Sequence, residues 1–310
     1  MGTDEICKKF ISDKILDINP LGNGHINDTF LVKTMARDYV IQKVPKDINI
    51  SHLEYNFNLY SEVMDKCGLL YPKWIRNKDG NFYQLDENDG AWRMYPYIEC
   101  DAISQPLSKA MLYSLGQGLA KLHSAFREIT KDPIPVYPHL HDLRFYYQKY
   151  KRLLGEDGRA LQERMMVEQI ESLSDGFLSA DERRQSIIHA DTKLTNVLFK
   201  DGQVIGFIDF DTIMPGPATF DIADAIRSCC VQNGKVDKEA RDSLVEGYLS
   251  LTDAGEAQEL TDHLQQDYNR LCFELALRYY IDVISGENYF KDKDRTYKLE
   301  RVRTLLDGIT

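Results

Sequence analysis

Residues 186–211 constrain the fold more than any other part of this chain, because three short apolar runs there each begin or end at a polar side chain. The run SIIH ends at His189, NVLF begins at Asn196, and VIGFID ends at Asp209. The KDGQ tetrapeptide between the second and third runs is a tight-turn signal. Short strands joined by short connections bring their ends together, so we expect Asp191, Asn196 and Asp209 to lie close in space.

This spacing of polar residues is typical of phosphoryl transfer, a reaction that needs positioned groups and Mg²⁺ more than covalent chemistry by the protein. A carboxylate followed five residues later by an amide, Asp191 and Asn196, has the spacing of the protein-kinase catalytic loop. Mg²⁺ takes one or two carboxylates plus phosphate oxygens. We therefore predict that Asp191 accepts the proton of the acceptor hydroxyl, and that Asn196 and Asp209 bind the metal. Lys193 would offer a cation to the transferred phosphoryl group, and His189 would support the loop through hydrogen bonds.

The N-terminal third of the chain is rich in predicted strands. Two segments rich in β-branched and aromatic residues, 28–34 and 38–44, predict a hairpin. Apolar residues at helical spacing before Gly68 predict the helix that follows. A further strand is expected over 92–98, where Pro96 would take the chain out of the sheet because it has no N–H to donate.

Helical patterns dominate the remainder of the chain. They cover 107–127, 142–154, 158–173, 220–231, 238–251, 256–285 and 295–306. The order of elements predicts an α+β protein with two lobes, residues 1–100 and residues 101–310. The first would hold an antiparallel sheet and a helix, and the larger second lobe would be mainly helical. Substrate sites often form where two such lobes meet.

Composition and charge exclude several classes of protein. The 310 residues include 38 basic and 49 acidic ones, which gives a net charge of −11, and they form no basic stripe. We therefore expect no nucleic-acid partner. The chain shows neither an apolar run of about 18 residues nor a signal-like N-terminus, so we expect no membrane association and a cytoplasmic location. The six cysteines lack metal-binding spacing. The adjacent Cys229 and Cys230 lie in an apolar helical pattern, which predicts buried and reduced thiols.

The first strands carry candidate nucleotide-binding residues. Gly22 and Gly24 precede a strand, where a flexible backbone could approach phosphate groups. Lys43 on the next strand is the candidate phosphate-anchoring cation. Gln42 is the alternative, because a register shift of one residue turns the side chain to the other face of the sheet. One of two acidic residues in the following helix would brace that cation, Glu54 or Glu62.

These motifs together resemble the aminoglycoside phosphotransferase and choline kinase superfamily. Within it, DTKLTNV at 191–197 and IDFDTIMPG at 208–216 resemble the bacterial N-acetylhexosamine 1-kinases. Further similar segments lie at 24–30, 39–43, 92–95, 221–227 and 278–290. The resemblance implies a bilobal protein-kinase-like fold, ATP as co-substrate, Mg²⁺ as cofactor and an amino sugar as acceptor.

The resemblance also implies roles for residues outside the catalytic loop. Tyr95 and Tyr97 fall in the segment that enters the hinge between the lobes, where backbone groups would contact adenine. Arg278 and Tyr289 become candidate acceptor-binding residues, beside Asp191 itself. Asp211 could bind metal, accept a hydrogen bond from a sugar hydroxyl, or cap the turn that follows it.

The resulting prediction is an ATP-dependent kinase that phosphorylates the anomeric hydroxyl of N-acetylglucosamine or N-acetylgalactosamine. One alternative is a kinase for another hydroxyl compound, such as choline, homoserine or an aminoglycoside. The other is a catalytically silent nucleotide-binding protein of the same fold, which the intact Asp191, Asn196 and Asp209 argue against. The sequence leaves the epimer preference, the nucleotide donor and the oligomeric state open.

Overall fold

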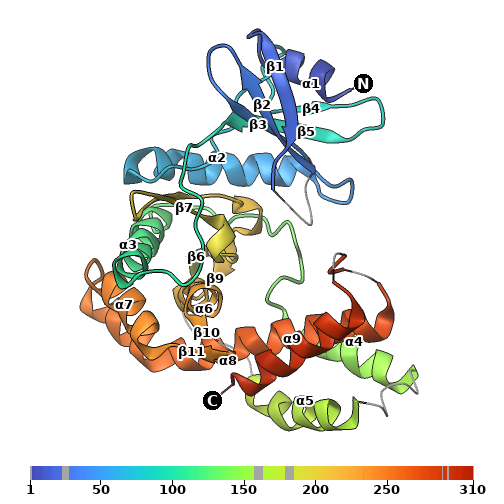
Figure 1. The fold of residues 1–310 in the computed structure, drawn as a ribbon, viewed down its shortest axis with the longest axis vertical. Helices are drawn as coiled ribbons and strands as arrows, with labels where there is room; N and C mark the ends of the chain where they lie inside the picture. Colours follow the sequence, from blue (N-terminus) through green and yellow to red (C-terminus); the bar gives the residue numbers. More distant parts are fainter. Residues whose placement is uncertain are drawn as a thin grey trace.

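An antiparallel sheet forms the N-terminal end of the molecule, and a helical body forms the rest (Figure 1). The computed structural model describes residues 2–22, 28–156, 163–178, 185–232, 234–287, 289–291 and 293–309. The predicted arrangement of a small sheet lobe and a larger helical lobe is confirmed. The lobe boundary at residue 100 stays a prediction.

The sheet has the strand order β1-β2-β3-β5-β4. Its strands are β1 (Ile15–Pro20), β2 (Asp28–Thr34), β3 (Tyr39–Lys43), β4 (Tyr83–Leu85) and β5 (Ala91–Pro96). The predicted hairpin is therefore confirmed as β2 and β3. The strand β5 ends at Pro96, as its missing N–H requires. The short strands β1 and β4 carry few β-branched or aromatic residues, which is why the sequence does not predict them.

The two faces of the sheet pack against different helices. On the outer face, Ile41 and Met94 pack with Ile6 of α1 (Thr3–Phe10). On the inner face, Val40 and Tyr95 belong to the main hydrophobic core, which includes the buried side of α2 (Ile50–Cys67). Figure 1 shows α2 between the sheet and the helical body. This helix ends as predicted, because Gly68 takes a left-handed conformation with φ of 76°.

The segment after α2 is fixed to the helical body by backbone hydrogen bonds. The Leu70 N–H donates to the carbonyl of Ile205 at 2.7 Å, and the Phe207 N–H donates to the carbonyl of Leu70 at 3.0 Å. Gly206 makes this approach possible, since a Cβ there would lie 2.0 Å from the Leu70 carbonyl oxygen. The sheet lobe is thus tied to the strand that leads into the predicted catalytic segment.

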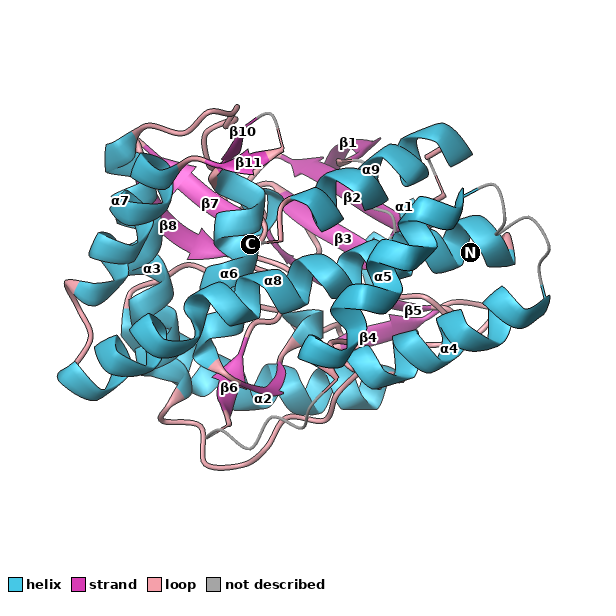
Figure 2. Cartoon of the chain, turned by 90° about the horizontal axis from the view of Figure 1, so that it is seen from below, coloured by secondary structure: helices cyan, strands magenta, loops and turns pink. Residues whose placement is uncertain are grey.

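Long helices build the larger lobe. They are α3 (Lys109–Phe126), α4 (Leu143–Glu156), α5 (Arg164–Phe177), α6 (Ala218–Cys229), α7 (Lys238–Leu249), α8 (Ala254–Ser285) and α9 (Arg295–Asp307). Figure 2 shows α8 running through the middle of this lobe. The helix predicted over 158–173 is observed as α5, which begins at Arg164 and ends at Phe177. Residues 157–162 lie outside the described residues. None of the helices in the described ranges is both long and apolar enough to cross a membrane.

Short antiparallel strand pairs are inserted among these helices. They are β6 (Ser186–Ile188) with β9 (Met214–Gly216), β7 (Val197–Lys200) with β8 (Gln203–Phe207), and β10 (Val231–Gln232) with β11 (Lys235–Val236). The predicted strands of the 186–211 segment are therefore present. Cys229 and Cys230, just before β10, are buried and form no disulfide, as predicted. Burial raises the pKa of the Cys229 thiol to about 12, which keeps it protonated.

The close packing of α3 against α7 predicts a large effect of one added methyl group. A Cβ at Gly116 would lie 2.0 Å from the Leu244 carbonyl oxygen, so the two helix backbones must separate. We expect Gly116→Ala to lower the free energy of unfolding by about 2–3 kcal/mol, measured by urea denaturation. Gly176→Ala is the control, because no atom lies within 4 Å of its added Cβ. Equal stability of the two variants would contradict this packing.

Candidate active site

The loop after β6 brings three of the predicted catalytic residues together. The Asp191 Oδ2 atom accepts hydrogen bonds from Lys193 Nζ at 2.6 Å and from Asn196 Nδ2 at 2.9 Å. The same Asn196 amide also donates to the Asp191 carbonyl at 2.8 Å. Both hydrogen bonds end on Oδ2, and none of the described residues donates a hydrogen bond to Asp191 Oδ1. The side chain of Asp191 is therefore fixed through one oxygen while the other stays available.

Asp209 lies beside this loop, at the end of the β7–β8 hairpin. The Ile208 N–H donates to the Asn196 carbonyl at 2.9 Å, which holds the two segments side by side. Asp209 has a left-handed backbone with φ of 68°. Burial, followed by the nearby Asp211 and Asp191 carboxylates, raises the pKa of Asp209 to about 6. The Asp209 carboxylate makes no ion pair or hydrogen bond with the described part of the chain.

These features fit a divalent cation held together with phosphate groups. The described residues contain no group of three or more His, Cys, Asp or Glu side chains arranged to hold a metal ion alone. Mg²⁺ sites in kinases need only one or two protein carboxylates, because the phosphates supply the remaining oxygens. The Asp209 carboxylate, which makes no ion pair among the described residues, and the Asn196 side chain are the oxygen donors that such a site requires.

Asp211 is engaged by a residue that sequence reasoning missed. Arg93 of β5 donates two hydrogen bonds to the Asp211 carboxylate, at 2.5 and 2.8 Å. Both side chains are buried. Burial disfavours the charge on Arg93, but Asp211 outweighs this effect and the pKa of the guanidinium is raised. This ion pair joins the sheet lobe to the candidate site, while a role of Asp211 toward metal or substrate stays a prediction.

Asp221 supports the backbone of the catalytic loop from below. Its carboxylate accepts hydrogen bonds from the N–H groups of His189 and Ala190, at 2.8 and 2.7 Å. His123 of α3 lies 2.9 Å from the same carboxylate, and its hydrogen bond contributes to lowering the pKa of Asp221 against the effect of burial. His189 supports the loop as predicted, since its Nε2 lies 3.0 Å from the Ile208 carbonyl oxygen. The local sequence carries no signal for the distant His123.

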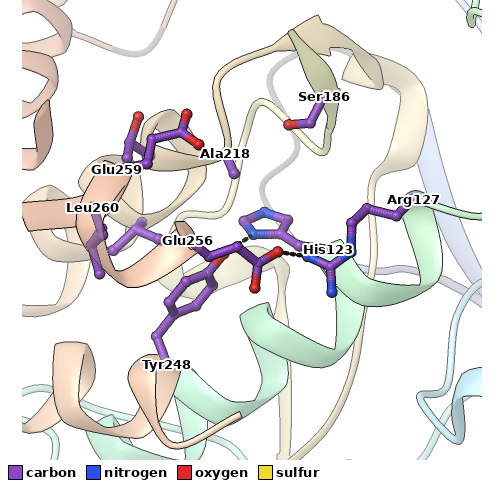
Figure 3. A pocket seen from close by; sticks show the side chains of 10 residues that line it. His123, Arg127, Ser186, Ala218, Tyr248, Glu256, Glu259 and Leu260 are labelled. Atoms are coloured by element: carbon purple, nitrogen blue, oxygen red, sulfur yellow. Dashed lines mark hydrogen bonds and ion pairs between the residues drawn. The ribbon is translucent and has the colours of Figure 1, made fainter. Parts of the chain in front are cut away.

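A small pocket lies next to the His123–Asp221 pair and not next to Asp191, Lys193 and Asn196. Figure 3 shows His123 beside Tyr248, and Arg127 paired with Glu256, on its wall. None of the predicted site residues lines it. The pocket is therefore not the candidate active site.

The structure places Lys43 away from the site. Lys43 Nζ pairs with Asp86 at 2.9 Å and lies over the Trp92 ring, on the outer face of the sheet. Gln42, one residue earlier, faces inward and accepts a hydrogen bond from Arg93 Nε at 3.0 Å. Lys43 as the nucleotide-anchoring cation is therefore not supported by the observed register, and Gln42 is the residue on the inner face. The acidic partner of Lys43 is Asp86, not one of the glutamates of α2.

The other predicted nucleotide-binding residues occupy varied positions. Gly22 follows β1 with φ of 73°, and Gly24 lies outside the described residues. Tyr95 is buried on the inner face, where burial and the nearby Asp209 raise the pKa of its hydroxyl. Tyr97 lies just past β5, and its N–H donates to the Asp38 carbonyl at 2.9 Å.

Arg278 and Tyr289 lie together, and their role in binding the acceptor stays a prediction. Arg278 Nη2 donates to the Tyr289 hydroxyl at 2.9 Å. The guanidinium also lies over the rings of Tyr289 and Tyr146, at 5.2 and 5.4 Å. Burial raises the pKa of the Tyr137 hydroxyl, and the charges of Asp211 and Tyr289 raise it further.

His141 is a third residue of the site that the sequence did not indicate, after Arg93 and His123. Its Nε2 lies 3.1 Å from the carbonyl oxygen of Ala190, the residue before Asp191. Its Nδ1 lies 3.4 Å from the buried Glu274 carboxylate. Burial lowers the pKa of His141, but Glu274 outweighs that effect, and the pKa is raised above 6.5.

This raised pKa predicts that His141 stabilises the protein more at low pH. Because the folded pKa exceeds the unfolded one, the contribution is complete below about pH 6.5 and is lost as the pH rises through the folded pKa. We expect His141→Asn to reduce the free energy of unfolding by about 1 kcal/mol more at about pH 6 than at about pH 8.5. Asparagine tolerates the positive φ of 59° at this position. The control is His139→Asn on the half-exposed neighbour, and a pH-independent loss in His141→Asn would refute the expectation.

The fold and the catalytic loop define a kinase-like phosphotransferase. Residues 17–260 match the model of the phosphotransferase enzyme family, and the chain belongs to that family. It is 24% identical over 255 residues to a homoserine kinase of Janthinobacterium sp. (strain Marseille), covering 77% of this chain and 73% of that protein. A homoserine kinase of Gluconobacter oxydans (strain 621H) is 21% identical over 257 residues, covering 79% and 76% of the two chains.

Solved structures of low sequence identity share the fold. The GDP complex of aminoglycoside 2'-phosphotransferase-IIIa matches with a TM-score of 0.68 and 12% identity, covering 98% of this chain and 97% of that one. Spectinomycin phosphotransferase with ADP and spectinomycin matches with a TM-score of 0.59 and 16% identity, covering 98% and 92%. The predicted kinase-like fold is thus confirmed.

Proposed function

We propose that this protein is an ATP-dependent kinase that phosphorylates the anomeric hydroxyl of an N-acetylhexosamine. The observation that carries the phosphoryl-transfer step is the Asp191 carboxylate, held by Lys193 and Asn196 through one oxygen only. The uncompensated Asp209 lies beside it. Family membership supports the reaction class. The acceptor is inferred from the resemblance of residues 191–197 and 208–216 to the N-acetylhexosamine 1-kinases, with Arg278 and Tyr289 as candidate acceptor contacts.

Each residue of the candidate site would have a separate role in the reaction. Asp191 Oδ1 would accept the proton of the acceptor hydroxyl as that oxygen attacks the terminal phosphate in line. Lys193, 2.6 Å from the other oxygen of Asp191, would place positive charge beside the transferred group. Asn196 and Asp209 would hold Mg²⁺, which when bound supplies charge neutralisation across the phosphates. Asp221 would keep the loop in place during the reaction.

The residues around Arg278 are suited to bind a neutral sugar. Tyr289 is 54% exposed, so its ring offers a surface on which a pyranose can stack. The Arg278 guanidinium beside it can donate hydrogen bonds to hydroxyl or N-acetyl oxygens.

Homoserine is the second candidate acceptor. The curated relatives are named homoserine kinase, at 21–25% identity. Arg278 is also suited to bind a carboxylate, because its planar guanidinium can donate two parallel hydrogen bonds. The two acceptors differ in what they present to Arg278, which makes them separable by experiment.

A panel of acceptors tests the proposal. We expect ADP release from Mg-ATP with N-acetylglucosamine or N-acetylgalactosamine, and none with the methyl glycoside, whose anomeric oxygen is blocked. Turnover with homoserine, choline or kanamycin instead would keep the reaction and reject the sugar. Nucleotide binding without turnover on any acceptor would favour the catalytically silent alternative.

Replacing the proposed base should separate catalysis from binding. Asp191→Asn keeps the size of the side chain but removes its basicity, so we expect turnover to fall by about 10²–10⁴-fold. The dissociation constant for ATP, measured by calorimetry, should change by no more than about threefold, or about 0.7 kcal/mol. Asp201→Asn, in the exposed turn between β7 and β8, is the matched control. Near-normal turnover of Asp191→Asn would reject Asp191 as the base.

A further inference from the structure

The candidate site contains three aspartates but only two paired cations. Asp191 is paired with Lys193, and Asp211 is paired with Arg93. Asp209 has no cationic partner among the residues that the structure describes, and it is more exposed than Asp211. The two aspartates of the Ile-Asp-Phe-Asp segment therefore have different electrostatic surroundings although they lie two residues apart.

Within that segment, Arg93 makes its hydrogen bonds to Asp211. Its Nη1 and Nη2 atoms engage both oxygens of the carboxylate, and the exposed fractions of the two side chains are 4% and 6%. Its Nε donates a hydrogen bond to Gln42 Oε1 at 3.0 Å. Its guanidinium also lies over the Trp74 ring at 4.8 Å. The guanidinium thus donates hydrogen bonds to Asp211 and Gln42, and each Asp211 oxygen accepts one of them.

Phe210, the residue between the two aspartates, is held in place by contacts of its ring. Phe210 is buried, stacks on Tyr60 of α2 at 4.7 Å between ring centroids, and lies 4.8 Å from His189. Asp209, just before it, has a left-handed backbone. Phe210 is thus fixed between Asp209, which follows the backbone contact of Ile208 with Asn196, and Asp211, which pairs with Arg93.

We propose that Arg93 is a positioning residue that sets how many carboxylates the metal site contains. By occupying both Asp211 oxygens, it leaves Asp209 as the one carboxylate of this segment that is available to a divalent cation. A site with one free carboxylate binds a bare cation weakly, so the metal would enter together with the phosphates of the nucleotide. The inference rests on Asp209 as a metal ligand, which is part of the proposed function.

Removing Arg93 should therefore strengthen binding of a bare cation. We would titrate the nucleotide-free protein with Mn²⁺ and follow free Mn²⁺ by electron paramagnetic resonance. In Arg93→Met the freed Asp211 adds a second carboxylate, and we expect the affinity for Mn²⁺ to rise about tenfold. Arg93→Met/Asp211→Asn should return to within about twofold of the original affinity. Arg76→Met, at an exposed arginine elsewhere in the sheet lobe, should leave it unchanged.

A merely structural role for Arg93 would not produce tighter cation binding. If Arg93→Met does not fold, Arg93→Lys replaces it, because lysine keeps the charge but cannot engage both Asp211 oxygens in the same way. We expect about a threefold gain in affinity from that variant. No gain in the folded variant would overturn the inference. Because the readout is cation binding and not turnover, its failure is distinguishable from a failure of the acceptor assignment.

Discussion

The Asp221 carboxylate is the interaction on which the rest of the site depends. It is fully buried at the start of α6 and accepts two backbone N–H groups from the loop that carries Asp191. One of them belongs to Ala190, which has a positive φ of 64° that is unfavourable for a residue with a Cβ. Two charge-assisted hydrogen bonds of about 1.5–3 kcal/mol each are enough to hold such a conformation. The strained turn is what directs Asp191 toward Lys193 and Asn196.

The two lobes meet through contacts that also shape the chemistry. The backbone of Leu70 bonds to both neighbours of Gly206, and Arg93 bonds to Asp211. A buried ion pair of this kind adds little net stability, because desolvation offsets the attraction. Loss of one partner is expensive, at about 3–5 kcal/mol, since the other charge is left buried. The pair is therefore better explained by the arrangement of charges that it imposes than by stability.

The sequence predicts those parts of the molecule that depend on neighbouring residues. The β2–β3 hairpin and α2 follow local patterns, and Asp191 and Asn196 lie within one loop. The face of β3 cannot be read in this way, because a shift of one residue exchanges Lys43 and Gln42. Lys43 also has a competing partner, Asp86, in the turn between β4 and β5.

Residues whose partners are distant in the chain cannot be predicted from one sequence. Arg93 lies 118 residues from Asp211, and His141 lies 49 residues from Ala190. Arg93 is a polar residue in a segment whose pattern predicts only a strand, and His141 lies in the turn before α4, outside every predicted element. Their roles emerge only when the fold brings them to the catalytic loop.

The most direct test of the central claim is the identity of the product. We would follow the unmodified protein with Mg-ATP and N-acetylglucosamine by phosphorus NMR. We expect a phosphomonoester signal, coupled to the anomeric proton of the sugar, to replace the terminal phosphate signal of ATP. Conversion of ATP to ADP and inorganic phosphate alone, or a phosphomonoester coupled to a different proton, would contradict it.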